Sequence, residues 1–367
     1  MIRLGDLIEL QRGHDLPEAE RREGTVPVIG SAGITGYHDT VKAPGPGVTI
    51  GRSGASFGKT TFVPTPYWPH NACLYVKNFK GNEVRFIAYL LENIDFSHLN
   101  SGAAQQSLNR NYLYPVEVPG FALPLQRRIA SILSAYDDLI ENHRKRIAIL
   151  EDMARRLYRE WFVHFRYPGH ESVPLVDSPL GRIPQGWSCS CISEIVKRHT
   201  PGKIFQKDET LSCGTIPVYD QSTDEVVGYH EGRPGITASL ERPIGMFGDH
   251  TCKLQLLVTS CSIGPNVVTF VVERELPMAF LCHAMIGLIT TQEYKRHWTQ
   301  LGAKSIVIPA SPLTRRFSDF VLPNVQLQET LKLLIRNLRR TRDLLLPRLM
   351  SGTLSVEALA TAEAAVS

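Results

Sequence analysis

The sequence predicts two mixed α/β domains in tandem duplication, joined by a long antiparallel coiled coil of two helices. Two observations carry this prediction: a repeat offset by about 190 residues, and apolar residues at heptad spacing after each copy. The chain has 367 residues, which is enough for two or three domains of roughly 100–200 residues each. The repeat is far too long for a solenoid, so two copies predict a pseudo-twofold molecule.

The repeat is visible at two places in each copy. Residues 24–39 read GTVPVIGSAGITGYHD, and residues 214–231 read GTIPVYDQSTDEVVGYHE. Further on, SGAA, V-x-V-P and LPLQ in residues 101–126 are echoed by LGAK, V-x-I-P and LPNVQLQ in residues 301–328. Runs of β-branched residues bounded by Gly, Pro or Asn predict strands, and two apolar stretches predict short helices. The strands are expected at 48–50, 74–76, 116–118 and 267–272, and the helices at 84–93 and 277–289.

Apolar residues alternate in steps of four and three after each copy, which is the pattern of a coiled coil. The first helix is expected to span about 40 residues, or about 60 Å, and the second about 20 to 25 residues, or about 30 to 38 Å. Pro347 should end the second helix or its main part. The order of the elements along the chain predicts an antiparallel pair. The predicted seam residues are Leu133, Ile140, Ile147, Leu150, Ala154, Leu157, Leu331, Leu334, Leu338 and Leu345.

Composition and charge narrow the function classes only slightly. The net charge of +4 permits a nucleic-acid partner without requiring one. The seven cysteines form no C-x-x-C pair, so buried thiols in a reducing cytoplasm are expected rather than disulfides or a zinc site. The first residues carry charges and no apolar h-region, so no signal peptide is expected. The longest apolar run, at 278–291, is too short to span a membrane, and a cytoplasmic protein is expected.

The stretch Gly51 to Thr61, GRSGASFGKTT, is close to the phosphate-binding motif G-x-x-x-x-G-K-[ST]. Ser53 stands where the first glycine of that motif belongs. Prolines at 64, 66 and 69 exclude the helix that such a loop requires. We therefore expect no ATP binding here. The loop is either a plain turn at a strand end or a surface that contacts DNA.

Three stretches, taken in order, resemble a known family. Residues 139–169, LIENHRKRIAILEDMARRLYREWFVHFRYPG, resemble the central conserved region of type I restriction–modification specificity subunits. Residues 344–356, LLLPRLMSGTLSV, are similar to the C-terminal ending of that family, and residues 101–126 resemble the end of a target-recognition domain entering its helix. The metal-binding motif H-E-x-x-H and the dinucleotide-binding motif G-x-G-x-x-G do not occur.

The resemblance implies two target-recognition domains, each of which reads one half of a bipartite, gapped site in double-stranded DNA. It implies a non-catalytic subunit whose helices hold these domains apart and dock two DNA-adenine methyltransferase subunits, which endonuclease/translocase subunits join. The cofactors S-adenosylmethionine, ATP and Mg²⁺ then belong to the partners, and this chain carries none. The two target-recognition domains are expected at 1–121 and 169–324. The helical regions are expected at 122–168 and 325–352, and a C-terminal tail at 353–367.

Candidate DNA contacts are the Arg, Asn and Gln side chains that can pair with base edges, together with nearby polar and basic residues. In the first copy they are Arg52, Ser53, Lys59, Asn71, Gln105, Gln106, Asn109 and Arg110. In the second copy they are Lys203, Tyr229, His250, Lys253 and Lys304. His250 near Cys252 is not expected to bind a metal. The second copy reads GAKSIVIPASPL where the first reads GAAQQSLNRNYL, so its polar Gln/Asn pattern is expected to be absent.

Helix length suggests how the two half-sites are spaced. Half-sites on one face of B-DNA lie roughly 34–36 Å apart, which the expected second helix would match, and half-sites of about 3–4 bp then leave a gap of about 6–7 bp. The aromatic run WFVHF at 161–165 either caps the coil against the second domain or forms part of a methyltransferase dock. Two rival functions remain open: a coiled-coil scaffold that binds only protein, and an enzyme with an unrecognised site.

Overall fold

The computed structural model describes residues 1–100, 107–222, 226–291 and 296–356. The chain forms two compact units, which we describe separately. Unit 1 comprises Met1–Asn142 with Leu334–Ser367, and unit 2 comprises His143–Leu333. Both long helices, α4 (Leu123–Tyr158) and α7 (Ser311–Met350), contribute to both units. Within the described ranges, no helix is both long and apolar enough to cross a membrane.

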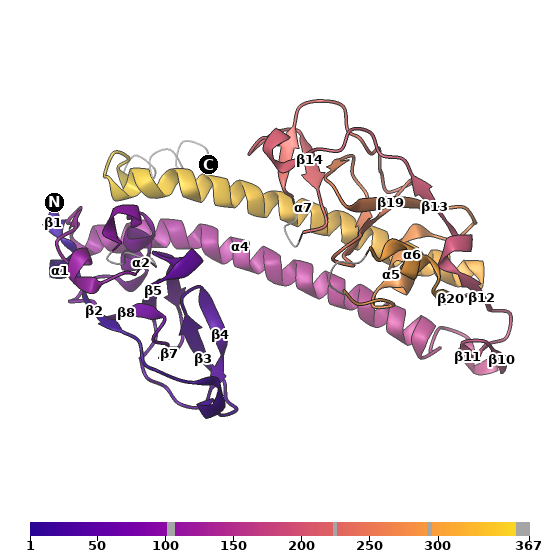
Figure 1. Ribbon diagram of the computed structural model, residues 1–367, viewed down its shortest axis with the longest axis horizontal. Coiled ribbons are helices and arrows are strands. Elements are labelled where there is room, and N and C mark those ends of the chain that lie inside the picture. Colours follow the sequence, from indigo (N-terminus) through magenta and orange to yellow (C-terminus); the bar gives the residue numbers. More distant parts are fainter. Residues whose placement is uncertain (101–106, 223–225, 292–295, 357–367) are drawn as a thin grey trace. The chain divides into compact units, whose positions relative to one another are not determined.

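Unit 1 is built on three small sheets (Figure 1). The largest has the order β2-β8-β5-β6 and is antiparallel throughout, the second has the order β4-β3-β7, and the third pairs β1 with β9. The strands are β1 Ile2–Arg3, β2 Glu9–Arg12, β3 Val26–Gly30, β4 Gly33–His38, β5 Gly47–Gly51, β6 Thr60–Val63, β7 Trp68–Pro69, β8 Cys73–Asn78 and β9 Glu117–Val118. The short helices are α1 Leu4–Leu7, α2 Val84–Glu92 and α3 Arg110–Leu113.

Unit 2 repeats this plan strand for strand. Its sheets have the orders β13-β19-β16-β17, β15-β14-β18 and β12-β20, and a hairpin β10-β11 is added. The strands are β10 Leu175–Ser178, β11 Gly181–Pro184, β12 Ser188–Cys191, β13 Val196–His199, β14 Ile216–Tyr219, β15 Gly228–His230, β16 Ile244–Gly248, β17 Leu254–Leu257, β18 Ser262–Ile263, β19 Val267–Val272 and β20 Ser305–Ile308. The short helices are α5 Met278–Met285 and α6 Trp298–Gly302. The tandem duplication predicted from sequence is therefore confirmed.

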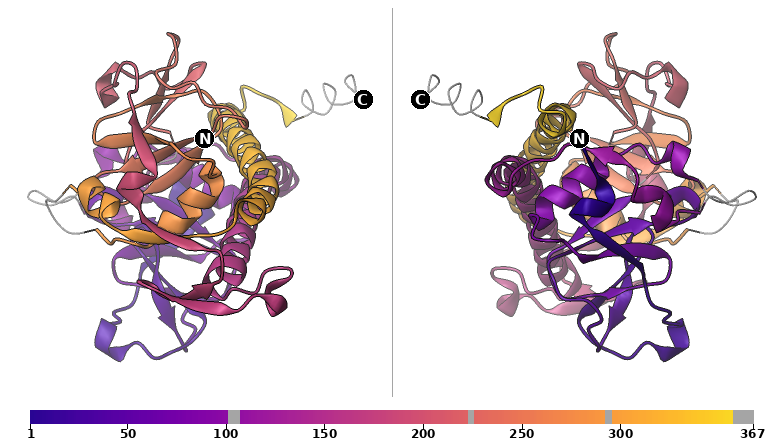
Figure 2. Two further views of the ribbon diagram at one scale, coloured as in Figure 1. Left: turned by 90° about the vertical axis from the view of Figure 1, so that its right-hand side faces the viewer. Right: turned by 90° about the vertical axis from the view of Figure 1, so that its left-hand side faces the viewer.

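The two long helices are antiparallel within each unit (Figures 1 and 2). In unit 1 the core joins Leu133, near the start of α4, to Leu349, near the end of α7. In unit 2 the core joins Ala154, late in α4, to Phe317 and Val321, early in α7. Contacts of early residues on one helix with late residues on the other are possible only for an antiparallel pair.

The residues predicted for the seam of α4 are buried or half-buried. Its a-type positions Leu133, Ile140, Ile147 and Ala154 are buried, and Leu150 and Leu157 are half-buried. The seam predicted in α7 needs a correction, because Leu334 is 41% exposed and Ile335 is buried instead. The apolar stripe of α7 advances by four residues from Leu331 to Ile335, which shifts its phase by one residue. Leu338 and Leu345 are half-buried.

The second helix is also longer than predicted. It begins at Ser311 and has 40 residues, so it is about 60 Å long rather than 30 to 38 Å. Pro312 lies in the first turn, where a missing N–H costs nothing. Burial of Phe317, Val321 and Leu331 on both sides of Pro323 outweighs the one backbone hydrogen bond that this proline removes. Pro347 does not end the helix either, since α7 continues to Met350.

Candidate nucleic-acid interface

Four strand ends meet at one end of the large sheet of unit 1. Strand β2 ends at Arg12 and β5 ends at Gly51, whereas β6 begins at Thr60 and β8 begins at Cys73. The antiparallel register brings these ends together, because Arg12 pairs with Leu74 and Gly51 pairs with Cys73. Residues just beyond the strands therefore share one edge, and six of the predicted contacts in unit 1 lie there: Arg52, Ser53, Lys59, Asn71, Asn109 and Arg110.

The loop between β5 and β6, residues 52–59, is a hairpin loop closed by backbone hydrogen bonds. The N–H of Gly58 donates to the carbonyl of Gly51 at 2.9 Å, and the N–H of Gly51 donates to the carbonyl of Lys59 at 2.9 Å. A Cβ on Gly51 would collide with the carbonyl oxygens of Ser31 and Ser56, so only glycine fits there. A strand, β6, follows the loop, as the sequence predicted when it excluded the helix of a nucleotide-binding loop.

Arg52 is held in place at this edge. Its N–H donates to the carbonyl of Ala72 at 3.1 Å, and its Nη1 donates to the carbonyl of Asn71 at 3.1 Å. The side-chain amide of Asn71 in turn donates to Asp15. Burial, and then the nearby charge of Arg12, lower the pKa of Arg52 below its ordinary value. The arginine is therefore a fixed, partly desolvated cation.

The segment before α3 closes the same edge. The N–H of Leu108 donates to the carbonyl of Arg52 at 2.8 Å, and Ser53 forms a β-bridge with Ser107. Asn109 caps α3 by accepting from the N–H of Asn111 at 3.0 Å. Arg110 donates from Nη1 to the carbonyl of Leu10 at 3.2 Å, and Lys59 is exposed. The predicted contacts Gln105 and Gln106 lie outside the described residues.

Sequence reasoning missed Arg12 at this edge. It ends β2, and its charge contributes to lowering the pKa of Arg52. No local pattern marks it, because its position depends on the pairing of β2 with β8, which lies about 60 residues further along the chain. The one feature of the sequence that could have indicated Arg12 is that a charged residue ends a strand containing apolar residues.

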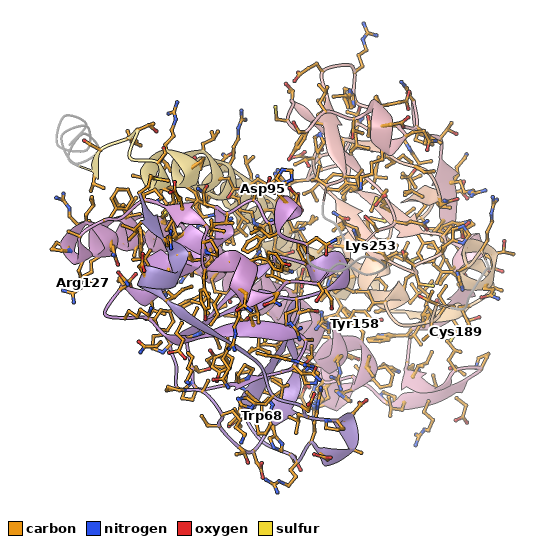
Figure 3. The ribbon with its side chains drawn as sticks, turned by 60° about the vertical axis from the view of Figure 1, so that its left-hand side comes forward. Trp68, Asp95, Arg127, Tyr158, Cys189 and Lys253 are labelled. Atoms are coloured by element: carbon orange, nitrogen blue, oxygen red, sulfur yellow. The ribbon has the colours of Figure 1, made fainter. Side chains whose placement is uncertain are left out.

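The corresponding edge of unit 2 carries His250 and Lys253, which lie in the turn between β16 and β17 (Figure 3 labels Lys253). The N–H of His250 donates to the side-chain oxygen of Gln221 at 3.0 Å, and Nζ of Lys253 donates to the carbonyl of Ser222 at 2.7 Å. Among the residues that the structure describes, no cluster of three or more His, Cys, Asp or Glu could hold a metal ion. Because β16 and β17 take the places of β5 and β6 in the duplicated sheet, His250 and Lys253 correspond in position to the loop 51–59 of unit 1.

The other three residues predicted for unit 2 lie elsewhere. Lys203 forms an ion pair with Glu209 at 2.8 Å, and its Nζ lies 4.6 Å from the ring centroid of Phe205. Tyr229 belongs to β15 in the three-stranded sheet. Lys304 follows α6, and its carbonyl accepts from the N–H of Ile192, directly after β12. The structure does not gather these three with His250 and Lys253.

The pairing of GAKSIVIPASPL in the second copy with GAAQQSLNRNYL in the first also needs a correction. GAKSIVIP follows α6 and includes β20, so it corresponds to the residues around β9 and not to the polar segment before α3. The counterpart of that polar segment precedes α6 and reads TTQEYKRH at 290–297. This segment is polar but contains one Gln and no Asn, so the Gln/Asn pattern of the first copy is not repeated there; residues 292–295 lie outside the described residues.

Comparisons with known proteins agree with this architecture. Residues 1–152 match the family model of the type I restriction modification DNA specificity domain. The chain is 24% identical over 348 residues to the specificity subunit of the type I restriction enzyme MjaIX of Methanocaldococcus jannaschii, covering 85% of this chain and 79% of that protein. A crystal structure of the S subunit of a type I restriction–modification system from M. genitalium superimposes with a TM-score of 0.63 at 16% identity, covering 95% of each chain. Residues 1–152 thus match a type I restriction modification DNA specificity domain, and the whole chain is similar in sequence to a type I specificity subunit and in its duplicated fold to an S subunit.

Proposed function

We propose that each unit reads one half of a bipartite, gapped DNA site. The observation that carries the proposal is the strand-for-strand duplication, which gives each unit its own four-stranded sheet with polar and basic residues beyond the same strand ends. In unit 1 these residues include Arg52, Lys59 and Asn71, and in unit 2 they include His250 and Lys253. Arg, Asn and His offer donors and acceptors to base edges, and Lys offers a charge to phosphate. Two copies of one reader in a single chain suit a site with two separate parts.

The chain itself is proposed to be non-catalytic and to act in the cytoplasm. Its partners are double-stranded DNA, two DNA-adenine methyltransferase subunits and endonuclease/translocase subunits. S-adenosylmethionine, ATP and Mg²⁺ would be bound by those subunits. This assignment is supported by the strand that follows the GRSGASFGKTT loop, because a phosphate-binding loop leads into a helix.

The test is a genome-wide map of adenine methylation in a host that carries the partner methyltransferase, with and without this chain. We expect a gapped two-part motif that disappears when the chain is deleted. An unchanged map, with both proteins shown to be expressed, would contradict DNA recognition and favour a protein-binding scaffold.

The helices are proposed to set the gap between the half-sites. Because α4 and α7 each contribute to both units, insertions must be made in both helices to keep their packing in register. Four added residues per helix lengthen each by about 6 Å, which corresponds to about 2 bp of B-DNA. A methylation map of the double insertion should therefore show a longer gap between unchanged half-sites. An unchanged gap would refute the proposal that helix length sets the spacing of the half-sites.

A further inference from the structure

Arg52 of unit 1 and Asp249 of unit 2 occupy the same place in the duplicated fold. The N–H of Arg52 donates to the carbonyl of Ala72 at 3.1 Å, just before β8, and the N–H of Asp249 donates to the carbonyl of Asn266 at 2.9 Å, just before β19. The carbonyl of Arg52 accepts from Leu108, and that of Asp249 accepts from His297 at 3.0 Å. One position in the backbone thus carries opposite charges in the two units.

The reason for this difference lies in how each unit caps the short helix that follows. In unit 2 the carboxylate of Asp249 accepts from the N–H groups of His297 and Trp298 at 3.0 and 2.8 Å, where α6 begins. Asp249 is 7% exposed, and its Oδ1 accepts both of these capping hydrogen bonds. In unit 1 Asn109 caps α3 by itself, so position 52 has no capping task and is open to a residue with another role.

The guanidinium of Arg52 has hydrogen-bond donors that are available to a ligand. In the described part of the chain neither Arg52 nor Arg12 forms an ion pair with a carboxylate, and Nε of Arg52 is buried without a hydrogen-bond partner. Two guanidinium groups close together are unfavourable unless a ligand supplies acceptors. The one side-chain hydrogen bond that Arg52 makes, to the carbonyl of Asn71, fixes its direction and leaves most of its N–H donors unused.

A fixed, recessed arginine is better suited to a base than to a phosphate. Guanine presents the acceptors O6 and N7 side by side in the major groove, and arginine is their commonest partner. Phosphate contacts need only an exposed charge, which Lys59 already offers in the same loop. We propose that Arg52, with Arg12 beside it, reads a guanine in the half-site of unit 1, and that unit 2 makes no equivalent contact because Asp249 stands at that position. This inference rests on the proposed function.

The test uses the complex of this chain with its methyltransferase partner, assayed for methyl transfer on a duplex library randomised across both half-sites. Arg52→Lys keeps the charge but removes the two-pronged geometry. We expect it to lower the preference for guanine at one position of one half-site by about 10-fold or more, with the other half-site read as before. Retained reading of that second half-site also shows that the variant is folded and assembled.

The matched control is Lys77→Ala, which removes a positive charge from the opposite end of strand β8, where Lys77 pairs with Glu9. It should leave every base preference unchanged. Equal weakening of all sequences by Arg52→Lys or Arg52→Ala would show a phosphate contact and overturn the inference, as would an unchanged preference. If the wild-type complex selects no gapped motif at all, the proposed function fails first and this inference fails with it.

Discussion

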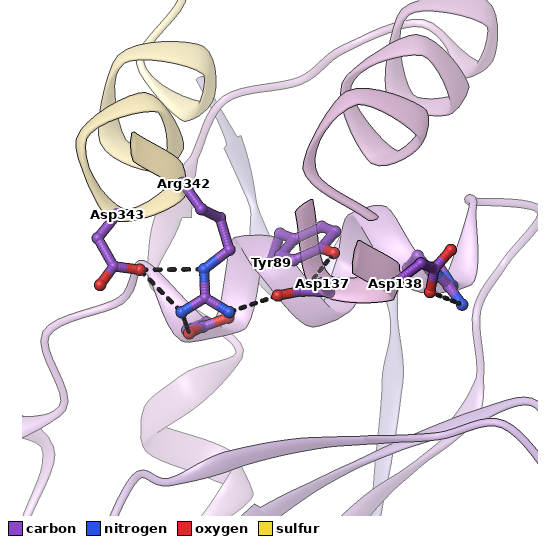
Figure 4. A network of polar contacts seen from close by, with 7 residues as sticks. Tyr89, Asp137, Asp138, Arg342 and Asp343 are labelled. Carbon is purple, nitrogen blue, oxygen red and sulfur yellow. Dashed lines mark hydrogen bonds and ion pairs between the residues drawn. The ribbon is translucent and has the colours of Figure 1, made fainter. Parts of the chain in front are cut away.

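Nη1 of Arg342 on α7 lies 2.6 Å from the carboxylate of Asp137 on α4 (Figure 4). The same guanidinium contacts Asp343 at 2.8 Å and Glu92 of α2 at 3.8 Å. The hydroxyl of Tyr89, also on α2, donates to Asp137. Burial alone would lower the pKa of Arg342, but hydrogen bonds to Asp343 and Asp137 raise it above its ordinary value. Three helices of unit 1 are thus held by one charge network.

Replacing Arg342 should destabilise unit 1. Arg342→Ala leaves the half-buried carboxylate of Asp137 without its cationic partner, and we expect a loss of about 2 kcal/mol in the free energy of unfolding. Chemical denaturation followed by circular dichroism measures it. Arg340→Ala, at an exposed position two residues away, is the control and should cost little. A double-mutant cycle with Asp137→Ala that shows no coupling would disprove the network.

The aromatic side chains just after α4 contribute to the core of unit 2. Phe162 is 6% exposed and lies 4.8 Å from Phe280 and 5.4 Å from Phe317, as ring centroids. Phe162→Ala should therefore cost about 3–5 kcal/mol. Val163→Ala is the control, because Val163 is 52% exposed. If both variants unfold at the same temperature as the wild type, Phe162 does not carry the packing that its burial indicates.

Unit 2 should lose stability in mild acid because of His283. Its ring packs against Phe317 and Tyr158, and burial lowers the pKa of His283 below its ordinary value. The unfolded chain then takes up a proton at a higher pH than the folded chain, so stability is full above about pH 6.5 and falls as the pH drops through the folded pKa. Thermal unfolding from pH 8 to pH 5 should show this loss in the wild type.

The loss should become smaller in His283→Gln, which cannot take up the proton. His164→Gln, an exposed histidine of the same unit, serves as the control and should keep the wild-type pH dependence. A pH dependence that is identical in His283→Gln and the wild type would show that other groups cause it.

Lys59 should contact phosphate rather than a base. It is exposed in the hairpin turn beside Arg52. Lys59→Ala should weaken binding to all DNA sequences alike and reduce the slope of log affinity against log salt by about 1. Salt titrations of the complex on specific and random duplexes measure this slope. A change in base preference without a change in slope would instead make Lys59 a base-reading residue.

Local patterns predicted the first helix but not the second. In α4 the buried residues Leu133, Ile140 and Ile147 keep strict heptad spacing, so the sequence alone identifies the seam. In α7 three prolines obscure the helix, and the burial that maintains it, at Phe317 and Val321, comes from contacts with residues distant in sequence. The shift of the seam from Leu334 to Ile335 has the same tertiary origin.

The candidate site could be predicted only where glycines or a run of polar residues marked a loop in the sequence. The glycines of the loop 51–59 and the polar run ending at Arg110 marked two parts of the edge in unit 1. Arg12 and Asp249 carried no such signal, since the first depends on the pairing of β2 with β8 and the second on a cap across about 48 residues. Side chains brought together by sheet register are hidden from local reading.

The inclusion of α7 in both units has a consequence for synthesis. The core of unit 1 packs Leu133 and Phe86 against Leu346, Leu349 and Met350, which leave the ribosome long after the first module has emerged. While unit 2 is being translated, the apolar face that these residues will cover is open to solvent. Unit 1 is therefore completed last, and we expect its uncovered apolar face to make the nascent chain prone to aggregation in this interval.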